Sequence, residues 1–349
     1  MVVLTTNKNR EDYVMRKLLL TSSALVAAAS ISSYAAADVS VTGEFEWTYT
    51  QQAADQTSKD GDSFATDNEV VISFTNKTDN GLTVSGKLEM DADDGDEANV
   101  SVDESVLSIS GGFGTFRLGL EDPADETFGI DEQDLIDEEG NGLFTSASLG
   151  NTSNLGLAGD ANKIAYITPK MGGFQAGYSI ADSGASGTTD TNAIGASYSM
   201  PIGGGAITIK YNQATRDADT DTDTTNMGVQ VSMGAMTLIA SSGTKEIADD
   251  EDIEGNGFGI KYDMGGGMTI AAATVEVTDE TDVDGTEEEK YQANIGEVVY
   301  TVAPGLKAKV TYTDYEYKNG GAVGSGNGTT HSGGDDSGQI TSLTITAAF

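Results

Sequence analysis

The stretch "SLTITAAF" (residues 342–349) alternates apolar with small or polar side chains up to its last residue. Leu343, Ile345 and Phe349 fall on one side of this alternation, and the two threonines fall on the other. A period of two is typical of a β-strand, because successive side chains of a strand point to opposite faces. The stretch therefore predicts a strand with one strongly apolar face that ends on an aromatic ring.

The same alternation recurs through most of the chain. Val39 and Val41 begin a segment in which apolar residues alternate with Ser, Thr and Glu, and around Leu88 the alternating partners are Lys87 and Glu89. Apart from the N-terminal region, no run approaches the roughly 20 apolar residues that a membrane-spanning helix needs. We therefore expect an all-β fold whose strands have one apolar face and one polar or charged face.

The connections between the expected strands are of two kinds. Short ones that contain Gly or Pro suit tight hairpins, and they begin near Asp79, Gly111, Pro169, Pro201, Met233, Met264 and Ala303. Longer ones are acidic or rich in Gly, and they lie near residues 51–66, 91–98, 122–161, 182–190, 216–224, 244–255, 278–288 and 318–337. Seven short and eight long connections would join sixteen strands.

An even number of strands with alternating short and long connections is the signature of a transmembrane β-barrel. Such a barrel satisfies every backbone polar group in lipid without leaving an open edge. A soluble β-sandwich also alternates, but it has little reason to keep all its short turns at one end. We therefore expect a 16-stranded antiparallel transmembrane β-barrel over residues 38–349. Its closure would pair the last strand with the first, and this seam would involve Val39, Val41, Leu343, Ile345 and Phe349.

Residues 1–37 precede the first expected strand and have the layout of an export signal. Arg16 and Lys17 are followed by an apolar stretch and then by small residues up to Ala37. This order is typical of a cleaved secretory signal peptide. The alternative is an uncleaved membrane anchor, for which the apolar run is short and interrupted by Ser and Thr. We expect an N-terminal extension plus a cleaved signal peptide, with Met15 as an alternative start.

The composition excludes several classes of function. The chain of 349 residues has no cysteine and a formal net charge of −38. Without cysteine there is no disulfide, thiolate metal site or catalytic thiol. The acidic balance argues against a nucleic-acid partner, because phosphate binding needs clustered Lys and Arg. His331 is the only histidine, and no nucleophile motif such as G-x-S-x-G accompanies it, so we expect no enzyme.

Three parts of the chain resemble one protein family. Residues 101–125, "SVDESVLSISGGFGTFRLGLEDPAD", are similar to the strand, turn and strand that lead into the third loop of general Gram-negative porins. Residues 162–179, "NKIAYITPKMGGFQAGYS", resemble the next hairpin of that family, and Phe349 matches its closing strand. The chain departs from the family in its scarcity of arginine, since only Arg117 and Arg216 follow residue 37.

The resemblance implies a homotrimer of 16-stranded barrels in the outer-membrane lipid. It also implies that the long third loop folds inward and narrows each pore. In this family the terminal aromatic residue, here Phe349, is the signal that the barrel-insertion machinery reads.

Strand parity predicts which charged side chains face the pore. If Phe116 and Leu118 face lipid, then Arg117 and Glu121 face the lumen, and Lys87 does so by the same argument. A Lys or Arg on the lipid face near the midplane would cost about 2–4 kcal/mol. The lumen is therefore the favoured place for these cations.

The longest connection is acidic, and the resemblance implies that it folds into the pore. Its carboxylates would then lie opposite Lys87 and Arg117 across a water-filled gap, and the opposed charges would orient dipolar solutes. The alternative is that some of these carboxylates belong to a solvated loop surface. The candidate constriction residues on this connection are Asp122, Asp125, Glu126, Asp131, Glu132 and Asp134.

These observations favour a passive diffusion channel for small hydrophilic solutes and ions, with a preference for cations because of the acidic excess. The alternatives are a substrate-specific porin and a structural or adhesive barrel with a plugged lumen. We expect no cofactor other than Ca²⁺ or Mg²⁺ held loosely by acidic outer loops. The segments "EDIEGN" and "ETDVDGTEEE" are examples of such loops. Neither continues to the bidentate Glu of an EF-hand, because Lys261 and Tyr291 occupy those positions.

Overall fold

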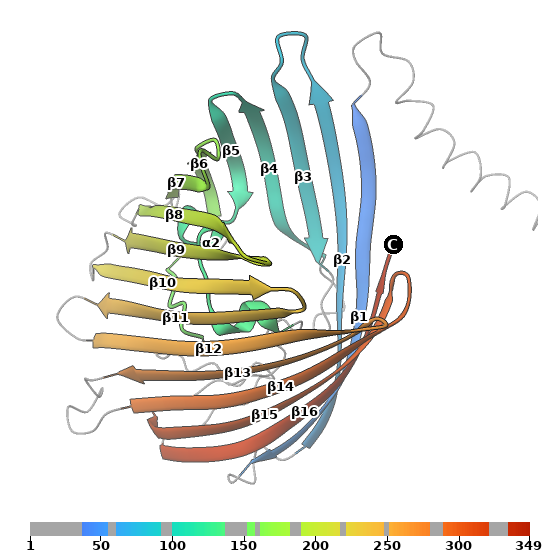
Figure 1. Cartoon of the computed structure of the whole chain (residues 1–349), viewed down its shortest axis with the longest axis vertical. Coiled ribbons are helices and arrows are strands. Elements are labelled where there is room, and N and C mark those ends of the chain that lie inside the picture. Colours follow the sequence, from blue (N-terminus) through green and yellow to red (C-terminus); the bar gives the residue numbers. More distant parts are fainter. Residues whose placement is uncertain are drawn as a thin grey trace, which may run out of the picture.

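Sixteen strands form one closed antiparallel barrel in the part of the chain that the structure describes. The computed structural model describes residues 37–54, 61–91, 100–136, 152–157, 161–181, 190–216, 221–247, 251–279, 289–320 and 334–349. Each strand pairs with its neighbours in sequence, and the first pairs with the last (Figure 1). This arrangement confirms the predicted 16-stranded antiparallel β-barrel. The expected extension and signal peptide, residues 1–37, lie outside the described residues apart from Ala37.

Many strands continue beyond the segments that alternation alone would predict. For example, β1 ends at Ala54 and β2 begins at Gly61, both inside the predicted connection 51–66. Antiparallel backbone pairing does not require an apolar face, so polar segments continue the ladder. The strands are β1 (Asp38–Ala54), β2 (Gly61–Lys77), β3 (Thr83–Asp91), β4 (Ser101–Gly111), β5 (Gly114–Glu121), β6 (Ala161–Ile167), β7 (Phe174–Ala181), β8 (Thr191–Ile202), β9 (Gly205–Arg216), β10 (Thr222–Met233), β11 (Met236–Ile247), β12 (Glu251–Gly265), β13 (Met268–Asp279), β14 (Glu289–Ala303), β15 (Leu306–Gly320) and β16 (Gly334–Ala348).

The seam between β1 and β16 closes the barrel. Leu343 and Ile345 lie opposite Tyr49 and Trp47 in this pairing. Beyond the last residue of β16, Phe349 exchanges two backbone hydrogen bonds with Gly43, at N–O distances of 3.0 and 3.2 Å. The end of the chain is therefore part of the seam.

Val39 and Val41 lie outside this pairing, in contrast to the expectation. They face Phe74 and Ile72 of β2, because β1 begins several residues before it meets β16. The two valines therefore extend the first hairpin and do not close the barrel.

The outward face of the barrel is more exposed and more apolar than its interior. Leu343 is 39% exposed, whereas its neighbour Thr344 is fully buried. In a soluble protein, the apolar side chain would be buried and the polar one exposed. Outward-facing Phe258 and Tyr262 of β12 are likewise exposed. Such a continuous apolar band is stable when lipid, not water, surrounds it.

No helix among the described residues is long and apolar enough to cross a membrane.

The connection between β5 and β6, called L3 here, folds into the barrel. Its described residues are 122–136 and 152–157, with helix α2 (Ala124–Thr127) and the 3-10 helix η1 (Glu132–Leu135). Figure 1 shows α2 within the ring of strands. Helix α2 contacts β7, β8 and β9, whereas η1 contacts β11, β12 and β13. The predicted inward-folded third loop is confirmed.

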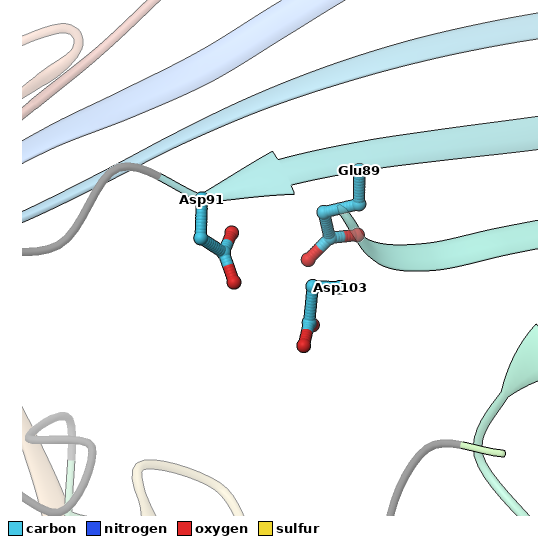
Figure 2. Close-up of side chains that lie close together, drawn as sticks. All are labelled: Glu89, Asp91 and Asp103. Carbon is cyan, nitrogen blue, oxygen red and sulfur yellow. The ribbon is translucent and has the colours of Figure 1, made fainter. Parts of the chain in front are cut away.

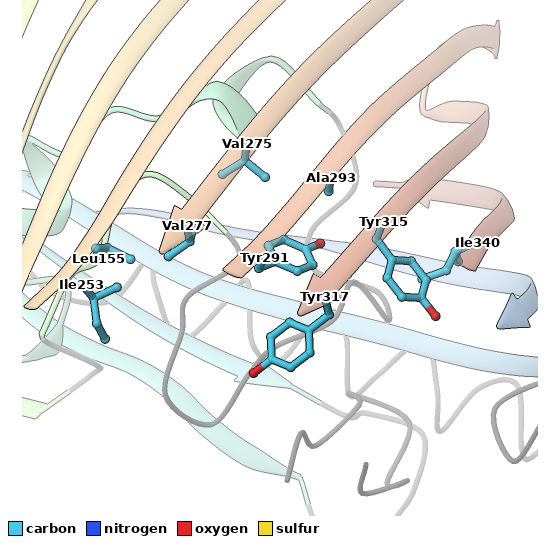
Figure 3. Packing of buried hydrophobic residues seen from close by; sticks show 9 residues of the cluster. All are labelled: Leu155, Ile253, Val275, Val277, Tyr291, Ala293, Tyr315, Tyr317 and Ile340. Carbon is cyan, nitrogen blue, oxygen red and sulfur yellow. The ribbon is translucent and has the colours of Figure 1, made fainter. Parts of the chain in front are cut away.

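A buried apolar cluster also lies inside the barrel, on the inner face of β12–β16. Leu155 of L3 packs there with alternate residues of these strands (Figure 3). These residues depart from the expected polar or charged inner face of the strands, because an inward-folded loop needs an apolar surface to pack on. The other members of the cluster are Ile253, Val275, Val277, Tyr291, Ala293, Tyr315, Tyr317 and Ile340.

Candidate functional site

L3 crosses the inner wall on a row of glycines, which we call the glycine track. The loop approaches this row so closely that added Cβ atoms would collide with it. A Cβ on Gly195 would lie 2.5 Å from the Cβ of Phe128, and one on Gly228 would lie 2.8 Å from the Cγ2 of Ile130. The track consists of Gly177 in β7, Gly195 in β8, Gly228 in β10, Gly243 in β11, and Gly255, Gly257 and Gly259 in β12.

Hydrogen bonds hold L3 on this track. The amide N–H of Ala124 donates to the Oγ of Ser179 at 2.9 Å, and the N–H of Ile130 donates to the Oδ1 of Asn226 at 3.1 Å. The Nζ of Lys210 donates to the carbonyl oxygen of Gly129 at 2.7 Å. These contacts satisfy backbone groups that the loop buries away from water.

The glycine track was not predicted from the sequence. A signal was present, since Gly255, at the end of the predicted connection 244–255, and Gly257 and Gly259, in the expected strand that follows, recur with a period of two. Glycine weakens a strand interior and often marks a site where another backbone approaches closely. Such a spacing could therefore have predicted a glycine face, though not the loop that covers it.

Gly243→Ala tests how the track positions L3. The new Cβ would lie 2.2 Å from the carbonyl oxygen of Ser153, which is backbone and cannot rotate away. We expect the returning part of L3 to move, the single-channel conductance to increase, and stability to fall by about 1–3 kcal/mol. Conductance in planar bilayers and thermal unfolding in detergent measure both effects.

Gly296→Ala is the matched control, because a Cβ at that position of β14 meets nothing within 4 Å. It should behave like the wild type in both measurements. A Gly243→Ala protein with wild-type conductance and stability would contradict the proposed close packing.

The structure divides the candidate carboxylates of L3 into two groups. Glu126 and Asp134 are exposed, and Asp122 and Asp131 are half-buried. The Oδ1 of Asp131 accepts from the N–H groups of Gln133 and Asp134, at 2.9 and 3.2 Å. This bond caps η1. Burial raises the pKa of Asp131 to about 6.

Asp125 and Glu132 form the second group, because they are buried against the wall and do not face open lumen. Asp125 is 2% exposed and Glu132 is fully buried. Burial raises the pKa of Asp125 above its ordinary value and that of Glu132 to about 7. The structure therefore places these two groups where they can hold the loop, in contrast to the expected role at the edge of the gap.

The predicted cations point inward but have partners on their own wall. Lys87 forms ion pairs with Glu104 and with Glu89, the latter at 2.5 Å. The Nη1 of Arg117 lies 3.3 Å from the Oε2 of Glu121. These cations therefore pair with carboxylates of their own strand, Glu89 and Glu121, or of the adjacent strand, Glu104.

Lys163 of β6 also points inward and was not among the predicted site residues. Its Nζ donates to the carbonyl oxygen of Glu121. Parity within the segment 162–179 could have identified it, since Ile164 and Tyr166 face outward. This cation, like Arg117, is therefore held at the base of L3.

The wall far from the glycine track carries many carboxylates. In register, Glu44 lies opposite Glu69, Glu46 opposite Asp67, and Glu69 opposite Asp91. Carboxylate oxygens of Glu89, Asp91 and Asp103 lie within 4.8 Å of one another, and Figure 2 shows the three groups directed together. We call this set the acidic wall: Glu44, Glu46, Asp67, Glu69, Glu89, Asp91, Asp103 and Glu104.

A cavity of about 290 Å³ lies at one end of the acidic wall. Four of its lining residues are acidic and two are lysines, Lys307 and Lys309 of β15. Lys309 is 4% exposed, and its Nζ lies 3.4 Å from the Oε2 of Glu46. The hydroxyl of Thr346 donates to the same oxygen at 3.0 Å. Part of the positive charge at this end is thus balanced locally.

L3 and the acidic wall lie on opposite sides of the lumen. The loop contacts strands from β7 to β13, and the wall belongs to β1–β4. In a closed ring of sixteen strands, β2 and β3 are half a circuit from β10 and β11. The exposed Glu126 and Asp134 of L3 therefore share the lumen with an opposing wall of the same sign.

An apolar outer band, a charged interior and an inward-folded loop define the class of outer-membrane transport barrels. The chain belongs to the Gram-negative porin family, whose model matches residues 21–320. It is an outer-membrane porin channel, and the members of its family are channel proteins. No curated protein sequence matches the chain.

Solved porin structures share the fold at low sequence identity. An anion-selective porin from Comamonas acidovorans has a TM-score of 0.68 and 18% identity, and the match covers 90% of this chain and 100% of that one. OmpT of Vibrio cholerae in its trimer form has a TM-score of 0.65 and 11% identity, covering 90% and 99%. A mutant of Rh. blastica porin has a TM-score of 0.62 and 16% identity, covering 89% and 100%. At sequence identities this low, the similarity shows a shared fold and nothing further.

Proposed function

We propose that this porin is a water-filled channel for passive diffusion of small hydrophilic solutes and ions, and that it prefers cations. The observation that carries the preference is the acidic wall, which faces the exposed carboxylates of L3. Rows of charged side chains determine which ions a pore admits. Lys87, Arg117 and Lys309 are each paired with a carboxylate, and the many carboxylates of the acidic wall support a negative potential in the lumen.

The anion-selective neighbour does not oppose this proposal, because ion selectivity depends on pore side chains and not on the barrel fold. The formal charge of −38 supports the same sign. A negative potential raises the local concentration of cations, and added salt screens the effect.

The test of this function is the reversal potential of single channels in a KCl gradient. We expect the potential to have the sign that indicates greater permeability to K⁺ than to Cl⁻. We expect this preference to weaken as the mean salt concentration rises. A clear preference for Cl⁻ would overturn the proposed selectivity, and the absence of conductance steps would overturn the open channel itself.

We further infer that the constriction lies between L3 and the acidic wall. Glu126 and Asp134 are the carboxylates that the loop directs into the gap, with Asp122 and Asp131 at its edge. Lys87, Arg117 and Glu121 border the opposite side and the base of the loop. Asp125 and Glu132 contribute by fixing the loop in place.

Assembly and export complete the proposal. A homotrimer is supported by the trimer form of OmpT, a structural neighbour. We infer that residues 1–37 direct export, and that Phe349 is recognised by the barrel-insertion machinery. We also propose that acidic outer loops bind Ca²⁺ or Mg²⁺ loosely, since such cations prefer carboxylate oxygens.

A further inference from the structure

Glu132 occupies the centre of a small polar network between L3 and the wall. Its Oε2 accepts a hydrogen bond from the Oγ of Ser153 at 2.7 Å and lies 3.5 Å from the Oγ of Ser241. The two serine hydroxyls are themselves hydrogen-bonded at 2.6 Å. The backbone N–H of Ser153 donates to the Oε1 at 3.4 Å. Both oxygens of this buried carboxyl group are therefore engaged.

The network joins three parts of the molecule. Glu132 belongs to the part of L3 that enters the barrel, Ser153 to the part that returns, and Ser241 to strand β11. The carboxyl group also fills the space left by glycine, because a Cβ on Gly257 would lie 1.7 Å from the Oε2. One side chain thus ties the two limbs of the loop to each other and to the wall.

The surroundings of Glu132 favour its uncharged form. Its hydrogen-bond partners are two hydroxyls and one amide, and the titratable groups that face it are Asp131 on L3 and Tyr291 on β14. Neither group supplies positive charge. Burial is the main cause of its raised pKa of about 7, and Asp131 raises it further. A neutral carboxyl group can both donate and accept hydrogen bonds in this network.

We propose that Glu132 is a positioning residue of the channel, whose uncharged carboxyl group clamps both limbs of L3 to the wall and so sets the free cross-section of the pore. This inference rests on the proposed diffusion function. Loss of the hydrogen bonds around Glu132 would lower the ratio of docked to undocked loop about 10-fold or more.

The same clamp makes the pore width depend on pH. The pKa of Glu132 is raised from 4.5 to about 7 in the docked loop, so the docked state holds its proton more strongly than the undocked state. The contribution of the protonated carboxyl group to docking is therefore fully present below about pH 4.5. It decreases as the pH rises and is lost above about pH 7. Asp131 titrates nearby, with a pKa of about 6, and its charge acts in the same direction.

The test is the swelling of liposomes that contain the full-length porin, with neutral mono-, di- and trisaccharides as probes. Neutral sugars report pore width without responding to pore charge. Measurements at about pH 5 and about pH 9, two units on either side of the pKa, compare the two forms of the clamp. The wild type should admit the trisaccharide several-fold faster, relative to the monosaccharide, at the higher pH.

Three variants separate the clamp from other effects. Glu132→Gln keeps a neutral group that donates and accepts, so it should retain narrow exclusion at both pH values. Glu132→Ala should admit the larger sugars at both. Glu254→Gln removes an exposed carboxylate from the outward face of β12 and should follow the wild type.

Two results would overturn the clamp: wild-type exclusion that does not change with pH, or a Glu132→Gln protein as open as Glu132→Ala. If Glu132→Ala does not fold, the comparison of the wild type with Glu132→Gln still tests whether the change of exclusion with pH requires the carboxyl group of Glu132. Failure of the wild type to admit even the monosaccharide would overturn the diffusion channel instead, so the two failures are distinguishable.

Discussion

Removal of Phe349 should strongly reduce the yield of folded barrel and cost about 2–4 kcal/mol of stability. The ring of Phe349 stacks on Phe45 at a centroid distance of 6.0 Å. Its backbone exchanges two hydrogen bonds with Gly43. Without these contacts, β1 retains an unpaired edge at the seam, where closure of the barrel depends on pairing. The folded fraction can be measured by gel mobility with and without heating, and stability by thermal unfolding.

The molecules that do fold should conduct normally, because Phe349 is 61% exposed on the outer surface and does not face the lumen. Phe258→Ala is the control, since it removes another outward ring, far from the seam, on β12. Normal yield of trimer after deletion of Phe349 would refute the role of this residue in assembly.

Replacing Glu44, Asp67 and Glu69 together by Gln, Asn and Gln should abolish or reverse the cation preference. At about 8 Å in water, each charge contributes about 0.5 kcal/mol to the energy of a passing monovalent ion. Three such charges lower the energy of K⁺ by about 1.5 kcal/mol and raise that of Cl⁻ by as much, so their removal changes the ratio of K⁺ to Cl⁻ permeability roughly 100-fold without screening, and less as salt is added. Reversal potentials in a KCl gradient measure this shift directly.

Asp252, Glu254 and Asp314 supply a control with the same change in net charge. These three carboxylates are exposed and alternate with the buried Ile253 and Tyr315, so they lie on the outer face. Their amides should leave selectivity unchanged. If both triple variants shift the reversal potential equally, the preference arises from overall charge and not from the acidic wall.

The barrel could be predicted because its main signal is local. Leu343 and Ile345 alternate with Thr344 in the sequence. Each strand of the barrel contacts lipid with its outer face and water with its inner face, so its side chains must alternate in this way. Strand ends were less predictable. Gln52 still pairs with Gly61 in the first hairpin, so backbone pairing continues through a polar segment without a hydrophobic pattern.

Parity also predicted the direction of the charged side chains but not their partners. Lys87 points inward as expected. Lys87 lies opposite Val106 of β4, and its partner Glu104 is two residues from Val106 on the same face of that strand. Parity gives the face of each residue but not the register between two strands, so counting along one strand could not identify this ion pair. The register shift between Leu88 and Met90 changes the parity beyond it, and this is why the position of Asp103 beside Glu89 and Asp91 could not be predicted by counting.

The candidate site was only partly predictable for a related reason. Among the acidic residues of L3, nothing local distinguishes Glu126, which is exposed, from Glu132, which is buried. The difference arises from Ser241 and Gly257, which lie more than a hundred residues further along the chain. Burial of a carboxyl group depends on which strands the loop meets after the barrel has closed.

The sequence by itself determined the barrel, its strand number, its inward loop through family resemblance, and the inward direction of its cations. Alternation and turn residues are properties of neighbours in the chain, and they were sufficient for these conclusions. Only the tertiary structure decided which charged side chains lie close to one another. It placed the carboxylates of β1–β4 side by side, paired Lys87 and Arg117 within their own wall, and buried Glu132 on the glycine track. Electrostatic energy depends on distance through space, and sequence separation does not specify that distance.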